Sequence, residues 1–317
     1  MASSPSPSAA FPITSFELDC LRLAEVTKVI QLSSSYTVIV GLGAALMAHQ
    51  LTLIDYGLFS KVQPTDLLSH KVPQSPSPSI QATTDFFNYL TRIIEISILE
   101  STAPNDRAKM IYYWTKIADY CLSIRNIQTL KAITSALQGP PVARLKKTWG
   151  IVPKKTKATL SSLWSLVTEQ NNYATYREWL KKNTTRPAVP FLGVYIHDLT
   201  YLTVVVKRDG GDLASDKRVR EILDQLEYYR TGPDYGNYAE SSASQATSGP
   251  SISPFKKGRR ADEAAEKELE QEALSQFASH WILTRKWVSE KEIDELSLLR
   301  EPKSSSASAN TPSTAQS

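Results

Sequence analysis

Apolar residues recur at helical spacing along most of this chain, and this periodicity is the strongest constraint on its fold. Ranges 83–100, 106–125 and 262–285 each carry an apolar stripe with a period near 3.6. The clearest stripe has the spacing i, i+3, i+4, i+7: Val219, Ile222, Leu223 and Leu226. The best strand pattern is the short run 203–206, and a single run of this length does not make a sheet. The sequence therefore predicts an all-α protein.

Ser- and Pro-rich segments divide the chain. Residues 1–12, 72–79, 232–260 and 303–317 lack the apolar side chains that would offset the entropy lost on ordering. We therefore expect a low-complexity N-terminal segment, one domain over 36–302 with a disordered insert at 232–260, and a disordered tail.

Several classes of function lack their usual residues. The net charge is only +4, and basic residues alternate with acidic ones, so no nucleic-acid partner is predicted. Phosphate-binding P-loop and G-x-S-x-G motifs are missing, and the cysteines and histidines do not cluster at metal-ligand spacing. We expect no cofactor, no metal and no covalent catalysis. The longest apolar stretch, 36–48, is too short to cross a bilayer, which favours a soluble, cytoplasmic binding protein.

Four stretches, taken in order, resemble one family. They are HQLTLIDYGLF at 49–59, the long block 107–149 that ends in RLKKTW, PFLGVYIHDL at 190–199 with NY and YR just upstream, and SEKEIDELSLLREP at 289–302. Together they resemble the catalytic domain of Ras guanine-nucleotide exchange factors such as Son of sevenless. The resemblance implies a single bowl-shaped domain of packed helices with a protruding helical hairpin.

The resemblance also implies a function. Such a domain binds a small GTPase of the Ras, Rap or Ral type, opens its switch regions with the hairpin, and promotes GDP release and GTP loading. It would reach the inner face of the membrane transiently, through its GTPase. The alternative is a non-catalytic module that binds a GTPase through the same fold with a degenerate hairpin.

Candidate site residues follow from the same blocks. Residues expected to contact the GTPase are Arg144, Lys146, Phe191, Tyr195 and Asp198. Pro190 and Gly193 are expected to shape the backbone, and Asp198 could instead cap a neighbouring helix. Leu145 and Trp149 are expected in the core.

The exchange hairpin is expected to begin with a helix over 215–230. Its candidate residues are Lys217, Arg218, Arg220, Glu221, Ile222, Asp224 and Gln225. The insert would form the loop of this hairpin, and residues 262–281 its return helix. Two features depart from the family pattern. Gln225 stands where the family has an acidic residue, and residues 213–217 lack the usual aromatic. Residues 1–36 are also too short for the module that precedes the domain in relatives.

Overall fold

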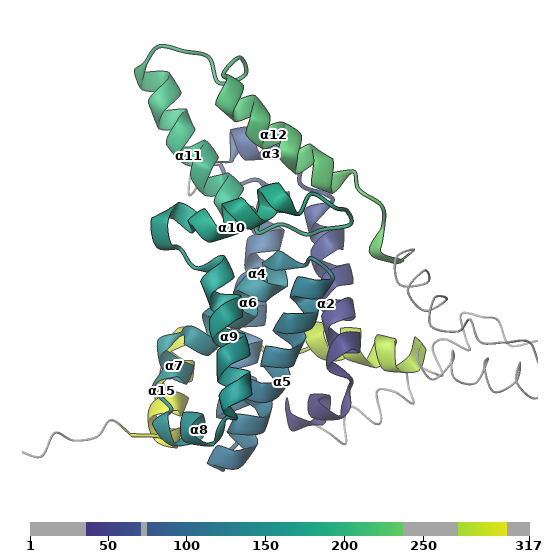
Figure 1. The fold of residues 1–317 in the computed structure, drawn as a ribbon, viewed down its shortest axis with the longest axis vertical. Coiled ribbons are helices and arrows are strands. Elements are labelled where there is room, and N and C mark those ends of the chain that lie inside the picture. Colours follow the sequence, from purple (N-terminus) through teal and green to yellow (C-terminus); the bar gives the residue numbers. More distant parts are fainter. Residues whose placement is uncertain (1–35, 71–74, 237–271, 303–317) are drawn as a thin grey trace, which may run out of the picture.

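The computed structural model describes residues 36–70, 75–236 and 272–302, which hold helices and no β-sheet (Figure 1). The predicted all-α fold is confirmed. The first helices are η1 (Tyr36–Gly41), α2 (Ala44–Phe59), α3 (Pro64–Ser69), α4 (Pro78–Leu99), α5 (Pro104–Ser123), α6 (Ile127–Gln138) and α7 (Pro140–Ala143). The later ones are α8 (Lys146–Ile151), α9 (Lys154–Val167), α10 (Gln170–Lys182), α11 (Leu192–Arg208), α12 (Lys217–Arg230) and α15 (Glu290–Arg300). The low-complexity segments 1–35 and 303–317, and all of the insert after residue 236, lie outside the described residues.

Helix ends follow local chemistry. Four helices, α3, α4, α5 and α7, begin at a proline, whose fixed φ suits the first helical position and whose missing N–H is not needed there. A capping box is present at the start of α15. The Ser289 side chain accepts from the backbone N–H of Glu292, whose carboxylate accepts from the backbone N–H of Ser289.

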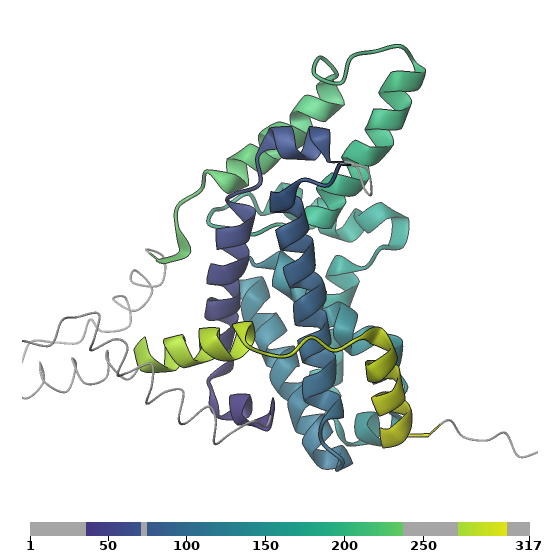
Figure 2. The same cartoon turned by 180° about the vertical axis from the view of Figure 1, so that it is seen from behind.

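The body of the molecule is built on α2, α4, α5 and α6, which pack side by side (Figures 1 and 2). The apolar stripe of α5 supplies much of the core, with Trp114, Ile117 and Cys121 fully buried. Leu145, expected in the core, is also fully buried, and Trp149 is half-buried against it. Helices α7, α8 and α15 lie together at one end of this body.

A polar cluster sits inside this core where α2 meets the start of α6. The buried carboxylate of Asp55 accepts hydrogen bonds from the side chains of Asn126 and Thr129. Asn126 also donates to Thr52 at 3.0 Å. None of these partners carries a positive charge, and burial therefore raises the pKa of Asp55 to about 6 despite the hydrogen bonds.

This raised pKa predicts a pH dependence. The folded protein holds the Asp55 proton more tightly than the unfolded chain, whose value is near 3.8. The stability gained by protonation is therefore complete below that value and is lost as the pH rises through about 6. Two pKa units correspond to about 3 kcal/mol. Urea unfolding of wild type and Asp55→Asn at several pH values should show wild type losing about this much relative to the variant. Parallel profiles would contradict the assignment.

A helical hairpin projects from the end of the body opposite α8 (Figures 1 and 2). Its two arms are α11 and α12, which run antiparallel and pack together. The turn between them begins with Gly210 at φ 70°, a left-handed conformation that suits glycine and ends α11. Asp216 then caps α12 by accepting from the backbone N–H groups of Arg218 and Val219. The predicted helix over 215–230 is confirmed to within two residues.

The expected pairing of this hairpin was wrong. The partner of α12 is α11, joined by the short turn 209–216, and not residues 272–281, the described part of the expected return helix. Residues 203–206, the best strand pattern, lie inside α11, where Leu199, Leu202 and Val206 form one buried face. Packing at helical spacing outweighs the β preference of the branched side chains.

The described part of the expected return helix lies on the body instead. Residues 272–283 are helical and bury Trp281 and Ile282. Ser279 donates to the side chain of Gln50 on α2, and Tyr89 on α4 donates to the carbonyl of Ile282. This segment therefore covers α2 and α4 and takes no part in the hairpin.

Candidate functional site

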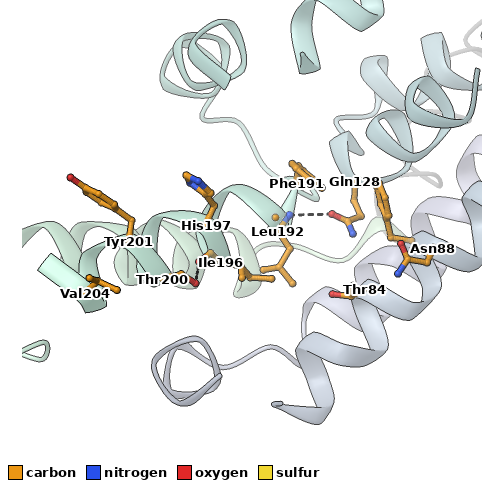
Figure 3. Close-up of a pocket in the computed structure, with 12 residues that line it drawn as sticks. Thr84, Asn88, Gln128, Phe191, Leu192, Ile196, His197, Thr200, Tyr201 and Val204 are labelled. Atoms are coloured by element: carbon orange, nitrogen blue, oxygen red, sulfur yellow. Dashed lines mark hydrogen bonds between the residues drawn. The ribbon is translucent and has the colours of Figure 1, made fainter. Parts of the chain in front are cut away.

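An open groove runs between α4 and α11 at the base of the hairpin, with a volume of about 670 Å³ (Figure 3). Its lining is mostly apolar. Tyr201 and Val204 on α11 line it and remain 64% and 65% exposed, unusually high values for large apolar side chains on a packed helix. The full lining is Thr84, Phe87, Asn88, Gln128, Phe191, Leu192, Gly193, Ile196, His197, Thr200, Tyr201 and Val204. An exposed apolar surface of this kind is typical of a site that binds another molecule.

The aromatic ring of Phe191 forms the inner end of the groove. It packs against Phe87 and Tyr173, with ring centroids 5.9 and 5.7 Å apart. The chain turns tightly here, so that a Cβ on Gly193 would lie 2.4 Å from the Phe191 ring. Gly193 is therefore needed for the ring to take this position, in line with the backbone role expected from the sequence. Leu192 N–H donates to Gln128 and anchors the start of α11.

The first residues of α10 form a left-handed turn that supports this ring. Asn171, Asn172 and Tyr173 have φ values of 51°, 54° and 57°, a conformation that non-glycine residues seldom adopt. Arg177 holds the turn by donating to the carbonyl and the side chain of Asn172. Its other donors make a bidentate pair with Asp198 on α11, at 2.6 and 2.7 Å. Arg177 thus joins α10 to the hairpin base.

A buried cation lies behind the same ring. Lys131 on α6 is almost fully buried, and its ammonium group is 5.3 Å from the ring centroid of Tyr173 and 5.8 Å from that of Phe191. Glu169 accepts from Lys131 at 3.1 Å, and this hydrogen bond lowers the pKa of Glu169. The pair neutralises the buried charge while the aromatic faces cover it.

Residues at and just after the end of α12 also fasten the base of the hairpin to the body. Tyr56 on α2 donates to the carbonyl of Gly232, and its ring packs edge-on against Tyr235. Tyr235 is buried and donates to the carbonyl of Ile124. The side chain of Arg186 stacks on Tyr228 near the end of α12. The base is therefore held on several sides, while the turn 209–216 projects (Figure 1).

The candidate residues of α12 divide between two faces. Val219 and Leu226 are buried, and Ile222 is half-buried against the core with Leu223, as the stripe predicted. Exposed residues are Lys217, Arg218, Arg220, Glu221 and Asp224, while Gln225 is intermediate. Arg218 is paired with Asp216, whose pKa it holds at about 2. Arg220 donates to the carbonyl of Ser215 and leaves the rest of its guanidinium at the surface.

Tyr195 does not lie where a contact residue should. Its side chain is only 3% exposed, and burial raises its pKa well above the usual range. Its hydroxyl has no hydrogen-bond partner within the described residues. The expectation that its polar tip would face a partner is therefore wrong for this structure, because Tyr195 lies on the inner face of α11. Phe191 does line the groove, whereas Asp198 is not among the lining residues and is engaged with Arg177.

Arg144 and Lys146 lie far from this site. Arg144 follows α7 and Lys146 begins α8, and both helices lie at the end of the body opposite the hairpin (Figures 1 and 2). Arg144 is half-buried and donates to Ser297 of α15, whereas Lys146 is exposed. The structure therefore does not bring these two cations together with Phe191, Asp198 and the hairpin.

The comparisons with known proteins define the class. A family model described as the RasGEF domain matches residues 46–218, more than half of the chain. The chain belongs to the RasGEF domain family. The match covers the body, the groove and α11, and it ends at the start of α12.

The curated relatives are named as guanine nucleotide-releasing or exchange factors. The Ras-specific guanine nucleotide-releasing factor RalGPS1 of Danio rerio is 32% identical over 183 residues, which are 56% of this chain and 32% of that protein. RalGPS2 of Homo sapiens is 31% identical over 54% of this chain and 30% of its own length. The guanine nucleotide exchange factor SDC25 of Saccharomyces cerevisiae is 34% identical over 51% of this chain and 14% of its length. The chain thus spans about a third or less of these relatives.

The described residues hold neither a membrane-spanning helix nor a candidate metal cluster. None of the helices there is both long and apolar enough to cross a bilayer. The same residues hold no group of three or more His, Cys, Asp or Glu side chains that could bind a metal ion.

Proposed function

We propose that this chain is a guanine-nucleotide exchange factor for a Ras-family small GTPase of the Ras, Rap or Ral type. The GTPase binds at the groove between α4 and α11, and the α11–α12 hairpin holds its switch regions open so that GDP leaves and GTP loads. The protein works in the cytoplasm and meets its GTPase at the inner face of the membrane.

The observation that carries this proposal is a projecting hairpin whose base is fixed beside an open apolar groove, in a chain of the RasGEF domain family. Exposed Tyr201 and Val204 offer apolar contact area, and the exposed charges of α12 lie on the other arm. Support also comes from the relatives, which are named as nucleotide-releasing or exchange factors.

The physical basis of exchange is linkage. A protein that binds the nucleotide-free GTPase more tightly than the loaded form must weaken nucleotide binding by the same factor. No bond in the nucleotide is made or broken. A rigid hairpin serves this purpose, because a flexible one would adapt equally well to both forms of the GTPase.

Reversing one charge on the hairpin tests its role. Arg220 is exposed and makes a single hydrogen bond, to the carbonyl of Ser215, so Arg220→Glu should leave the thermal midpoint nearly unchanged. Nucleotide release from the responsive GTPase should nevertheless slow by about fivefold or more. Lys181→Glu on α10 makes the same charge change on another exposed helix and should leave release unaffected. Equal rates for wild type and Arg220→Glu would remove Arg220 from the GTPase-contacting surface.

A second candidate is a GTPase-binding module without exchange activity. Gln225 favours it, because the resemblance places an acidic residue at that position to compete with the nucleotide phosphate. The two functions differ in a binding measurement with nucleotide-free and GDP-loaded GTPases of the Ras, Rap and Ral types. An exchange factor binds the nucleotide-free form far more tightly. Equal affinity for both forms would support the module, and no affinity for any of them would exclude both.

A further inference from the structure

The positive charge of this chain is concentrated in one stretch. Residues 120–168 carry eight basic residues and no acidic one, although the net charge of the whole chain is only +4. Four lysines of this stretch are exposed around the junction of α8 and α9: Lys146, Lys147, Lys154 and Lys155. Ile151, between the two pairs, is 46% exposed. We call these five residues the basic corner.

The lysines of the basic corner are not neutralised by neighbouring carboxylates. None of them forms an ion pair with an acidic side chain of the described residues. Asp119 on α5 lines the same shallow depression as Lys155 but stays beyond ion-pair distance. Glu301 accepts from the backbone N–H of Lys147, but its charge is buried and paired with Arg107. The corner therefore presents unbalanced positive charge to solvent.

The positions of these lysines argue against a purely structural role. Each pair occupies the first turn of a helix, α8 or α9, where the helix dipole favours acidic residues and disfavours basic ones. Neither first turn contains an acidic residue of its own, although at α8 the carboxylate of Glu301 accepts from the backbone N–H groups of Lys147 and Thr148. At α9 the two lysines weaken the helix end and gain no ion pair in return, an arrangement typical of a functional surface.

We propose that the basic corner docks on an anionic lipid surface. Lysines around an exposed aliphatic side chain suit a bilayer interface, because the ammonium groups reach the headgroups while the apolar side chain enters the acyl boundary. Proteins that bind single-stranded nucleic acid rely more on exposed aromatic rings and arginine. The nearest indole, Trp149, is turned inward and donates to the carbonyl of Val142. The corner lies at the end of the body opposite the hairpin, so docking leaves the groove open (Figures 1 and 2).

The test is sedimentation of the full chain with phosphatidylcholine vesicles that contain, or lack, about a third phosphatidylserine. No GTPase is present, so the result is independent of the proposed exchange activity. Wild type should bind only the anionic vesicles and should be released as NaCl rises from about 0.1 M to about 1 M. The triple variant K146E/K154E/K155E should bind at least about tenfold more weakly, because each lysine near an anionic surface contributes severalfold to binding. Ile151→Ser should also weaken binding.

The matched control is K61E/K181E/K207E, which makes the same change in net charge at three exposed lysines elsewhere. It should bind like wild type, and all variants should melt at the wild-type temperature. Equal losses in both triple variants would show an effect of net charge alone and overturn the proposal. Lys256 and Lys257 belong to a basic run outside the described residues. If K256E/K257E lost binding while K146E/K154E/K155E bound fully, the proposal would also be overturned. Wild type could instead fail to bind anionic vesicles and bind single-stranded RNA through the same lysines. That result would overturn the proposal in favour of a nucleic-acid surface.

Discussion

Replacing Trp114 by alanine should lower the free energy of unfolding by about 3–5 kcal/mol. The indole is fully buried on α5 at the centre of the body, and its Nε1 donates to the hydroxyl of Ser97 on α4 at 2.8 Å. The truncation therefore leaves a large cavity and a buried hydroxyl without its donor. A loss of this size is a large part of the stability of a typical domain, so exchange activity should fall with the folded fraction.

Trp287 provides a matched control. It is 53% exposed, so Trp287→Ala should change the free energy of unfolding by no more than about 0.5 kcal/mol. Urea unfolding followed by circular dichroism measures both variants. Similar small changes for Trp114→Ala and Trp287→Ala would show that the body does not depend on this indole.

Replacing Glu301 by alanine should cost a similar amount, about 3–5 kcal/mol. Glu301 follows α15 and pairs with the fully buried Arg107 of α5 at 3.1 Å. It also accepts from Thr148 and from the backbone N–H of Lys147 at the start of α8. Its removal leaves the guanidinium of Arg107 buried without a counter-charge, and it removes one of the contacts that hold the segment after α15 to the body.

The pH dependence of this pair has a definite sign. Burial alone would raise the pKa of Glu301, but its several hydrogen bonds outweigh burial and lower the pKa below its ordinary value of 4.5. The stabilisation is therefore present above that value and is lost as the pH falls below it. Glu301→Ala should approach wild type in stability only under acidic conditions.

Two further variants complete this test. Glu295→Ala removes an exposed carboxylate of α15 and should change the stability by no more than about 0.5 kcal/mol. Arg107→Met combined with Glu301→Ala removes the unpaired charge, so the double variant should lose less than the two single losses together. Strict additivity would mean that Arg107 and Glu301 do not stabilise each other.

Helical periodicity was enough to predict the fold class. The stripes of α5 and α12 contain the residues that the structure buries, because a helix in a soluble domain must cover its apolar face. The Ser289 capping box is equally local, because it joins residues only three apart. The pairing of the hairpin was not local. It depends on α11 continuing through the β-branched run 203–206 to the turn at Gly210, which packing against α12 and α3 stabilises.

The sequence predicted less of the candidate site than of the fold. The motif blocks indicated Phe191 and Asp198. They did not indicate that Tyr195 faces inward, because the side of α11 that packs on the body is set by tertiary contacts. The role of Arg177 was missed because it depends on three left-handed residues, and nothing in their side chains predicts that conformation for Tyr173. Asn171 and Asn172 are the available signal, because asparagine tolerates the left-handed region better than most residues.

The central claim is tested most directly by the release of a fluorescent GDP analogue from purified Ras, Rap and Ral GTPases, with excess GDP and increasing amounts of the full chain. The account predicts that release from at least one of them accelerates in proportion to the added protein. It also predicts that Arg220→Glu reduces this acceleration while Lys181→Glu does not. Unchanged release from every GTPase, with protein that melts cooperatively and is therefore folded, would contradict the assignment as an exchange factor.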